Sequence, residues 1–184
     1  TRTARLLGAA TALAASATPR EVASALVDAA VGALAADGGM VAIREGREGA
    51  LRVVPTGAPP RPSVRRQSTQ LTVLPDGPLA LAAETGEAVW EPLDGNGPPH
   101  VAVPLLVSAH PVGALELHFG VARLLDPDER AFLLTLARIG GQALHRSRLF
   151  DDARGAHQDA DAARARAEAA NQAKAQFLAT MSHE

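Results

Sequence analysis

The stretch GALELHFGVARLLDPDERAFLLTL, residues 113–136, contains the two signals that decide the fold class. In its first part apolar and polar residues alternate, so that Leu115, Leu117 and Phe119 share one face, as in a β-strand that packs on a core. In its second part the run DPDE, residues 126–129, has the spacing of a helix N-cap with a glutamate three residues on. The sequence therefore predicts a strand followed by a helix.

The residues at the start of the chain predict two further helices. Residues 3–17 are rich in alanine and leucine, which are strong helix formers. The run TPRE, residues 18–21, has threonine as N-cap, proline in the first turn and glutamate three residues on, so a second helix should begin here. We expect Gly38 and Gly39 to end that helix, because glycine is the usual residue after a helix C-terminus.

Short apolar runs in the middle of the chain predict strands. These runs are residues 40–43, 51–54, 71–74, 88–91 and 101–107. Pro104 in the last run indicates a bulge or an edge position, because proline cannot donate to the strand ladder. Residues 77–85 predict a short helix, and residues 55–69, which hold four prolines and three arginines, predict a mobile loop.

The composition excludes several classes of function. The chain has no cysteine, which rules out disulfides, cysteine zinc sites and thiol catalysis. A net charge of −2 and an aromatic content of 3% argue against a nucleic-acid partner. No apolar run reaches the roughly 18 residues of a membrane span. Arg2, Arg5 and the apolar residues up to Ala17 also fit a short signal peptide, but we favour an amphipathic first helix in a cytoplasmic protein.

From residue 149 onward, small and apolar residues recur at alternating steps of four and three, the spacing of a coiled-coil heptad. This dimer seam consists of Leu149, Ala153, Ala156, Ala160, Ala163, Ala167, Ala170, Phe177 and Met181, with Lys174 as an interruption. In a parallel dimer, Asp159 of one helix would face Arg164 of the other. Each seam alanine buries one methyl group, about 0.8 kcal/mol against about 1.5–3 kcal/mol for leucine. We therefore predict a weak parallel homodimer, and a solvated single helix is the alternative.

The last eight residues, FLATMSHE at 177–184, resemble the opening of the phosphoacceptor helix of sensor histidine kinases. The resemblance implies that His183 is phosphorylated and that Glu184 is its general base. A neutral imidazole nitrogen is nucleophilic near pH 7, and an adjacent carboxylate can accept its other proton. With Leu149 at a d position, the heptad register puts His183 at a c position, away from the seam. Two alternatives stay open, namely a solvated helix end and the start of a His-Glu-x-x-His zinc site.

The order of the predicted elements carries a second resemblance. Two helices, a hairpin, a Val-Pro-Leu strand, the Gly-Ala-Leu-Glu-Leu strand and a closing helix are together similar to a GAF domain. This resemblance implies an α+β fold, with an antiparallel sheet that has helices on one face and a small-molecule pocket on the other. The chain then divides into a GAF-like sensory domain at 3–150, a signalling coiled-coil helix at 151–176 and the start of the phosphoacceptor helix at 177–184.

Together the two resemblances imply the sensory and dimerising part of a two-component sensor histidine kinase. Its partners would be a second copy of the chain, the receiver domain of a response regulator and an unidentified small-molecule ligand. ATP and Mg²⁺ are implied for a kinase domain, but the chain has no recognisable glycine-rich nucleotide lid, so we expect it to hold no cofactor and to be inactive alone. A stand-alone GAF module that binds a small molecule or dimerises is the alternative.

The sequence names no ligand and predicts no metal site. His118 lies on the polar side of its strand, and the other histidines lie beside turns or on exposed-looking helix faces. We therefore expect these histidines to be solvated or hydrogen bonded. Met40, Trp90 and Val103 fit the wall of a cavity as well as they fit a core.

Overall fold

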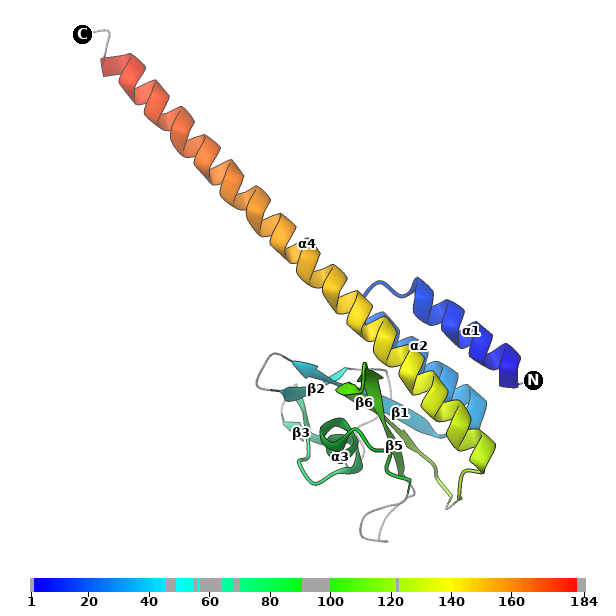
Figure 1. Cartoon of the computed structure of the whole chain (residues 1–184). Coiled ribbons are helices and arrows are strands. Elements are labelled where there is room, and N and C mark those ends of the chain that lie inside the picture. Colours follow the sequence, from blue (N-terminus) through cyan, green and yellow to red (C-terminus); the bar gives the residue numbers. More distant parts are fainter. Residues whose placement is uncertain are drawn as a thin grey trace. The chain divides into compact units, whose positions relative to one another are not determined.

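A computed structural model describes residues 2–45, 49–54, 56, 64–67, 70–90, 100–121 and 123–181 of the chain (Figure 1). The chain splits into two compact units, Thr1–Arg148 and Leu149–Glu184. The first unit holds every strand found in these described ranges. The second consists of the later part of one long helix.

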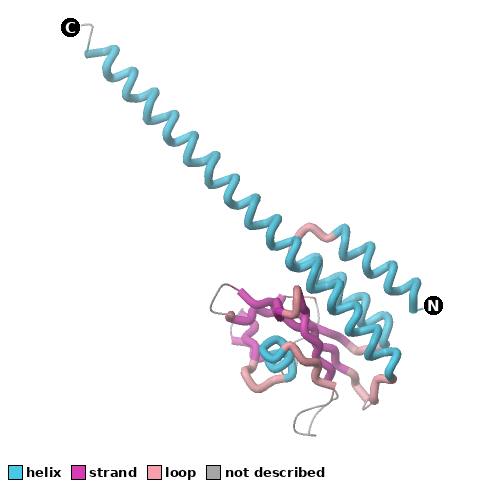
Figure 2. The backbone as a smooth tube through the Cα atoms, viewed as in Figure 1, coloured by secondary structure: helices cyan, strands magenta, loops and turns pink. Residues whose placement is uncertain are grey.

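The first unit is built on an antiparallel sheet, whose strands are magenta in Figure 2. Within the described residues it has six strands, in the order β3-β4-β2-β1-β6-β5. The strands are β1 (Gly38–Glu45), β2 (Ala50–Val54), β3 (Val64–Gln67), β4 (Gln70–Val73), β5 (His100–Val107) and β6 (His110–His118). The predicted α+β class with an antiparallel sheet is therefore confirmed. Pro104 lies in the edge strand β5, next to a register shift between Leu105 and Leu106, as the proline indicated.

The predicted loop at residues 55–69 is wrong in part. Residues 64–67 form strand β3, which pairs with β4 from Val64 to Gln67. Residues 55, 57–63, 68 and 69 lie outside the described part of the chain. Strand β3 contains Arg65 and Arg66 and no β-branched run, so local propensity gives little indication of a strand. These residues adopt the strand conformation through their pairing with β4.

In the part of the chain that the structure describes, four helices accompany the sheet. They are α1 (Arg2–Ala15), α2 (Pro19–Leu34), α3 (Pro78–Thr85) and α4 (Pro127–Met181). The two predicted capping signatures are confirmed. At α2, Glu21 N–H donates to Thr18 Oγ1 at 3.2 Å. At α4, Glu129 N–H donates to Asp126 Oδ1 at 2.7 Å, and Asp126 N–H donates to Glu129 Oε2 at 3.0 Å.

The end of α2 differs from the prediction. The helix closes at Ala35, which adopts a left-handed conformation with φ of 52°, and Gly38 and Gly39 begin β1 instead. Gly39 is small for a packing reason, because a Cβ atom there would lie 2.9 Å from the carbonyl oxygen of Glu116 on β6. Gly39 therefore serves the close approach of two strands and not a helix cap.

Both faces of the sheet are covered. Figure 1 shows α1, α2 and the start of α4 on one side of the sheet and α3 on the other. On the first side Leu115 and Leu117 pack with helix residues such as Leu26 and Leu133, all of them inaccessible to solvent. On the second side α3 contributes small residues and one leucine to a separate cluster, which consists of Met40, Ala42, Val53, Val73, Leu79, Ala80, Ala82, Ala83, Ala102 and Ala114. Each fully buried leucine stabilises the fold by about 1.5–3 kcal/mol.

Replacing Thr18 by alanine should lower the free energy of unfolding by about 1 kcal/mol, because the capping box at the start of α2 loses its side-chain acceptor. Thr11→Ala is the matched control. Its hydroxyl only bonds the carbonyl of Leu7 within α1, and alanine is the better helix former. Urea unfolding followed by circular dichroism measures both; equal losses in the two variants would contradict a specific role for the cap.

Candidate functional site

Three polar side chains gather on the α3 side of the sheet, where strands β5 and β6 pair. His100 begins β5, and Glu116 and His118 lie near the end of β6. The register sets His100 directly opposite His118 and Ala102 opposite Glu116. Because side chains alternate along a strand, all three point to the same face. We call this set the buried His–Glu cluster.

The cluster is removed from solvent. Relative exposure is 5% for His100 and 0% for both Glu116 and His118. Apolar groups flank it, since Glu116 lies between Ala102 on β5 and Met40 on β1 in the strand register. Helix α3 packs against both β5 and β6. A carboxylate in such surroundings needs a cationic or hydrogen-bonding partner, because desolvation of an unpaired charge is very costly.

The side chains in the cluster are close to one another. His100 Nδ1 lies 3.2 Å from Glu116 Oε1. This contact lacks the geometry of a hydrogen bond, and within the described residues His100 Nδ1 makes none. The two imidazole rings are 6.0 Å apart between centroids and are inclined at 72°. One nitrogen from each histidine and one carboxylate oxygen all lie within 4.8 Å of one another.

Of the two states expected for these histidines, solvated or hydrogen bonded, the solvated one is wrong for His100 and His118. The alternation in β6 was predicted correctly, with Leu115 and Leu117 on the face that carries α2 and α4. The opposite face carries the polar side chains of Glu116 and His118, but it is buried and not exposed to solvent. Strand β6 lies inside the sheet, between β1 and β5, and α3 covers its second face. Only the pairing of β5 with β6 reveals that His100 and His118 are neighbours.

The three residues considered for a cavity wall do not face one space. Met40 belongs to the cluster on the α3 side of the sheet, and Val103 belongs to the core on the other side. Trp90 is half-buried, and the guanidinium of Arg130 lies 5.1 Å from its ring centroid. Met40 and Val103 are therefore core residues.

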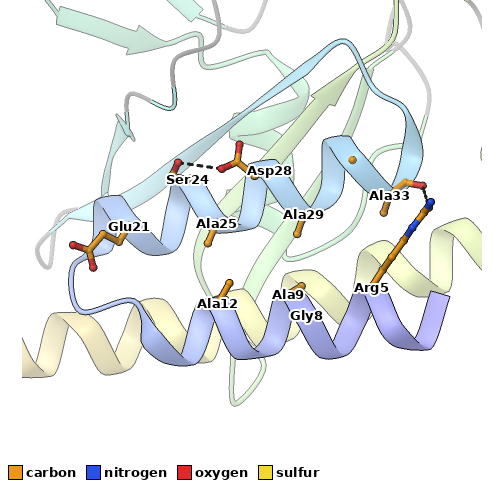
Figure 3. Close-up of a pocket in the computed structure, with 11 residues that line it drawn as sticks. Arg5, Gly8, Ala9, Ala12, Glu21, Ser24, Ala25, Asp28, Ala29 and Ala33 are labelled. Carbon is orange, nitrogen blue, oxygen red and sulfur yellow. Dashed lines mark hydrogen bonds between the residues drawn. The ribbon is translucent and has the colours of Figure 1, made fainter. Parts of the chain in front are cut away.

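An open groove of about 640 Å³ runs between α1 and α2 (Figure 3). Its walls are mainly glycine and alanine, with Gly8 and Ala12 on one helix and Ala25 and Ala29 on the other. The polar side chains at its margin bind their own chain: the Arg5 guanidinium donates to Ala33 O at 3.0 Å, and Ser24 lies 3.5 Å from Asp28. The groove therefore presents mainly small apolar residues to a ligand.

None of the helices in the described ranges is long and apolar enough to cross a bilayer.

The dimer seam lies on α4, and its small and apolar side chains from Leu149 to Phe177 are exposed in the single chain. Leu149 is 57% exposed and Phe177 is 63% exposed, values high for large apolar residues. The seam alanines at 153, 156, 160, 163, 167 and 170 are exposed as well. Arg164, which we expected opposite Asp159 of a second helix, lies 2.9 Å from Glu168 of its own helix.

The predicted phosphoacceptor pair follows the last described residue in the sequence. Helix α4 ends at Met181, and His183 and Glu184 lie outside the described residues. The zinc alternative at the same two residues lies outside them too. The structure therefore brings together a cluster that the sequence did not predict, while the predicted pair stays a prediction.

Known proteins match the chain in sequence pattern and in fold. A family model described as GAF domain matches residues 16–145. The GAF domain of the potassium sensor histidine kinase KdpD from Escherichia coli has a TM-score of 0.60 at 20% identity, and the match covers 81% of this chain and 96% of that one. The GAF domain of a phosphoenolpyruvate-protein phosphotransferase from Coxiella burnetii has a TM-score of 0.64 at 16% identity, with 84% and 96% covered.

An enzyme also has this fold. The free methionine-R-sulfoxide reductase from Neisseria meningitidis, solved in complex with its substrate, has a TM-score of 0.61 at 15% identity, with 78% of this chain and 88% of that one covered. A search of curated protein sequences finds no match. At these identities the structural neighbours establish the fold and not the activity.

Proposed function

Because the chain belongs to the GAF domain family, a class of signalling and ligand-binding modules, we propose that it is the sensory and dimerising part of a two-component sensor histidine kinase. One observation carries the proposal. Helix α4 begins at Pro127, directly after its capping residue Asp126, and continues to Met181, two residues before His183. A single helix thus leads from the sensory fold into the eight residues that resemble a phosphoacceptor site.

In this proposal His183 is the nucleophile. A neutral imidazole nitrogen attacks the γ-phosphorus of ATP, the bond to the β-phosphate oxygen breaks and ADP leaves. Glu184 takes the proton from the other ring nitrogen. The phosphoryl group then passes from His183 to an aspartate of a response-regulator receiver domain. ATP and Mg²⁺ would be bound by a separate catalytic domain. This chain would control whether His183 is accessible to that domain.

The dimer seam would couple the two functions. Its large apolar residues, Leu149 and Phe177, are exposed in the single chain and would be covered by the same residues of a second copy. Between them six alanines give only a weak seam. A weak seam responds to small forces, so a ligand-dependent change in the GAF domain would be able to shift the helix pair between two packings. We place this assembly in the cytoplasm, where ATP is available.

Phosphorylation of His183 tests the proposal directly. Residues 1–184 are joined, in register at the phosphoacceptor histidine, to the rest of that helix and the ATP-binding domain of a sensor histidine kinase of known activity. With labelled ATP we expect a phosphoryl group that is labile to acid and stable to base. His183→Gln should remove the label completely, because glutamine has no nucleophilic nitrogen.

His145→Gln is the matched control, because His145 is an exposed histidine on the same helix. It should be labelled like the parent chimera. Labelling that survives His183→Gln would place the phosphoryl group elsewhere and refute the assignment. A chimera that folds and dimerises but takes no label would instead favour a stand-alone GAF module that binds a small molecule or dimerises.

A further inference from the structure

We propose that the buried His–Glu cluster is a binding site for a divalent first-row transition metal, with His100, Glu116 and His118 as the three protein ligands. The residue types fit such an ion. Imidazole nitrogen suits Zn²⁺, Fe²⁺, Co²⁺ and Ni²⁺, and two histidines with one carboxylate are a common set with open coordination positions. Ca²⁺ and Mg²⁺ prefer oxygen ligands alone and fit this set poorly.

The distances require only a small contraction. A metal ion bound at about 2.0–2.2 Å from each ligand atom brings tetrahedral ligands to about 3.3 Å from one another. His100 Nδ1 and Glu116 Oε1 are already 3.2 Å apart. One ligand atom from each of the three residues lies within 4.8 Å of the others, so rotation of side-chain torsions closes the remaining gap.

The scaffold favours preorganisation. All three residues lie within two paired strands and none of them lies on a loop. The strand register holds His100 opposite His118. Ligands on strands are positioned more precisely than ligands on loops. The site is also dry, with His100 at 5% exposure and the other two residues at 0%. A divalent cation in these surroundings would neutralise the buried carboxylate of Glu116 and occupy a lone pair of His100 Nδ1, which makes no hydrogen bond within the described residues.

An ion pair between Glu116 and a protonated histidine is the competing account of the same side chains. The two accounts differ in what they require. An ion pair needs one proton and no metal, whereas the metal site needs neutral imidazoles and an ion. The proposal is independent of the role of His183, since His183 is not a ligand in it and metal binding is measured without ATP.

Titration of the full chain with Co²⁺ after removal of metal by a chelator tests the site. We expect one ion per chain, with visible d–d bands of a four- or five-coordinate site, and displacement of Co²⁺ by Zn²⁺. Thermal unfolding should shift upward as the Zn²⁺ concentration rises, because the folded state alone holds the ligands together. Absence of stoichiometric binding, or a spectrum of hydrated six-coordinate Co²⁺, would overturn the proposal in favour of the ion pair.

Substitution of the ligands gives the second arm. Glu116→Gln keeps the shape of the side chain, and His100→Gln removes one imidazole; each should weaken binding at least about a hundredfold, since loss of even an outer partner of a metal ligand costs about 10–100-fold. His145→Gln and His183→Gln should leave the affinity unchanged. Equal affinity in Glu116→Gln and the parent chain would refute the proposal.

A measurement on the unaltered chain covers the case in which these buried substitutions prevent folding. X-ray absorption of the Zn²⁺-loaded protein counts the imidazoles around the ion. Two imidazoles together with an oxygen ligand are expected from His100, His118 and Glu116. A shell without histidine, or with one, would contradict the assignment, whatever the behaviour of the variants.

Discussion

Replacing Gly141 by alanine should lower the free energy of unfolding of the GAF domain by about 2 kcal/mol, and replacing it by leucine should prevent folding. A Cβ atom at Gly141 would lie 2.6 Å from the carbonyl oxygen of Leu106 and 2.9 Å from its nitrogen. These are backbone atoms of β5, which cannot turn aside as a flexible side chain can. Alanine gains about 1 kcal/mol of helix propensity at such a position, but the clash with the strand outweighs that gain.

Gly32→Ala is the matched control for this prediction. Gly32 is also a helix glycine, in α2, and a Cβ atom there would have nothing within 4 Å. The same substitution should therefore raise stability by about 0.5–1 kcal/mol, through helix propensity alone. Chemical unfolding of both variants gives the comparison. Destabilisation of similar size at the two positions would show that propensity, and not the contact of α4 with β5, sets the effect.

Replacing Ala156, Ala160 and Ala163 by leucine should tighten the homodimer at least about a thousandfold. Each leucine adds apolar side-chain area to the seam, and six leucines in a dimer at about 1 kcal/mol each exceed the roughly 4 kcal/mol that a thousandfold change requires. In the labelled chimera the stiffened seam should also hold phosphorylation at one level, insensitive to changes in the GAF domain. Sedimentation equilibrium measures the first effect and the labelling assay measures the second.

The control places three leucines on the same helix away from the seam. Ala162, Ala165 and Ala169 occupy the c, f and c positions of the same heptad register, and all three are exposed. Leucine there should leave the monomer–dimer equilibrium unchanged, although the composition and the helix propensity match those of the seam variant. Similar tightening by both sets would mean that added hydrophobicity drives association without a defined register. No tightening by the seam set would favour a solvated single helix.

Local signals in the sequence predicted most of the elements correctly. Both capping boxes start helices where they were expected, because the reciprocal bonds between Thr18 and Glu21 and between Asp126 and Glu129 involve residues only three apart. The edge position of β5 followed from Pro104, whose ring removes a backbone donor. These predictions depend only on residues that are close together in the sequence, so the sequence is sufficient to make them.

The failures share one cause, which is contact between residues far apart in the sequence. The sequence pattern predicts a helix end at Gly39, yet its small size serves the approach of β1 to the backbone of Glu116. Residues 55–69 predict a loop, yet residues 64–67 form strand β3, which pairs with β4. His118 lies on the polar side of its strand, and alternation along one strand does not tell whether a second layer covers that side, as it does here.

The sequence by itself determined the α+β class, the order of the helices and main strands, the absence of cysteine chemistry and the heptad spacing that leads to His183. The α+β class is what the resemblance to a GAF domain implies, and the others follow from short-range periodicity, capping or composition. Only the tertiary structure decided that His100 and Glu116, which are sixteen positions apart, meet in a dry site beside His118. The physical reason is that strand register and the cover provided by α3 are set by packing of the whole domain, which no local pattern encodes.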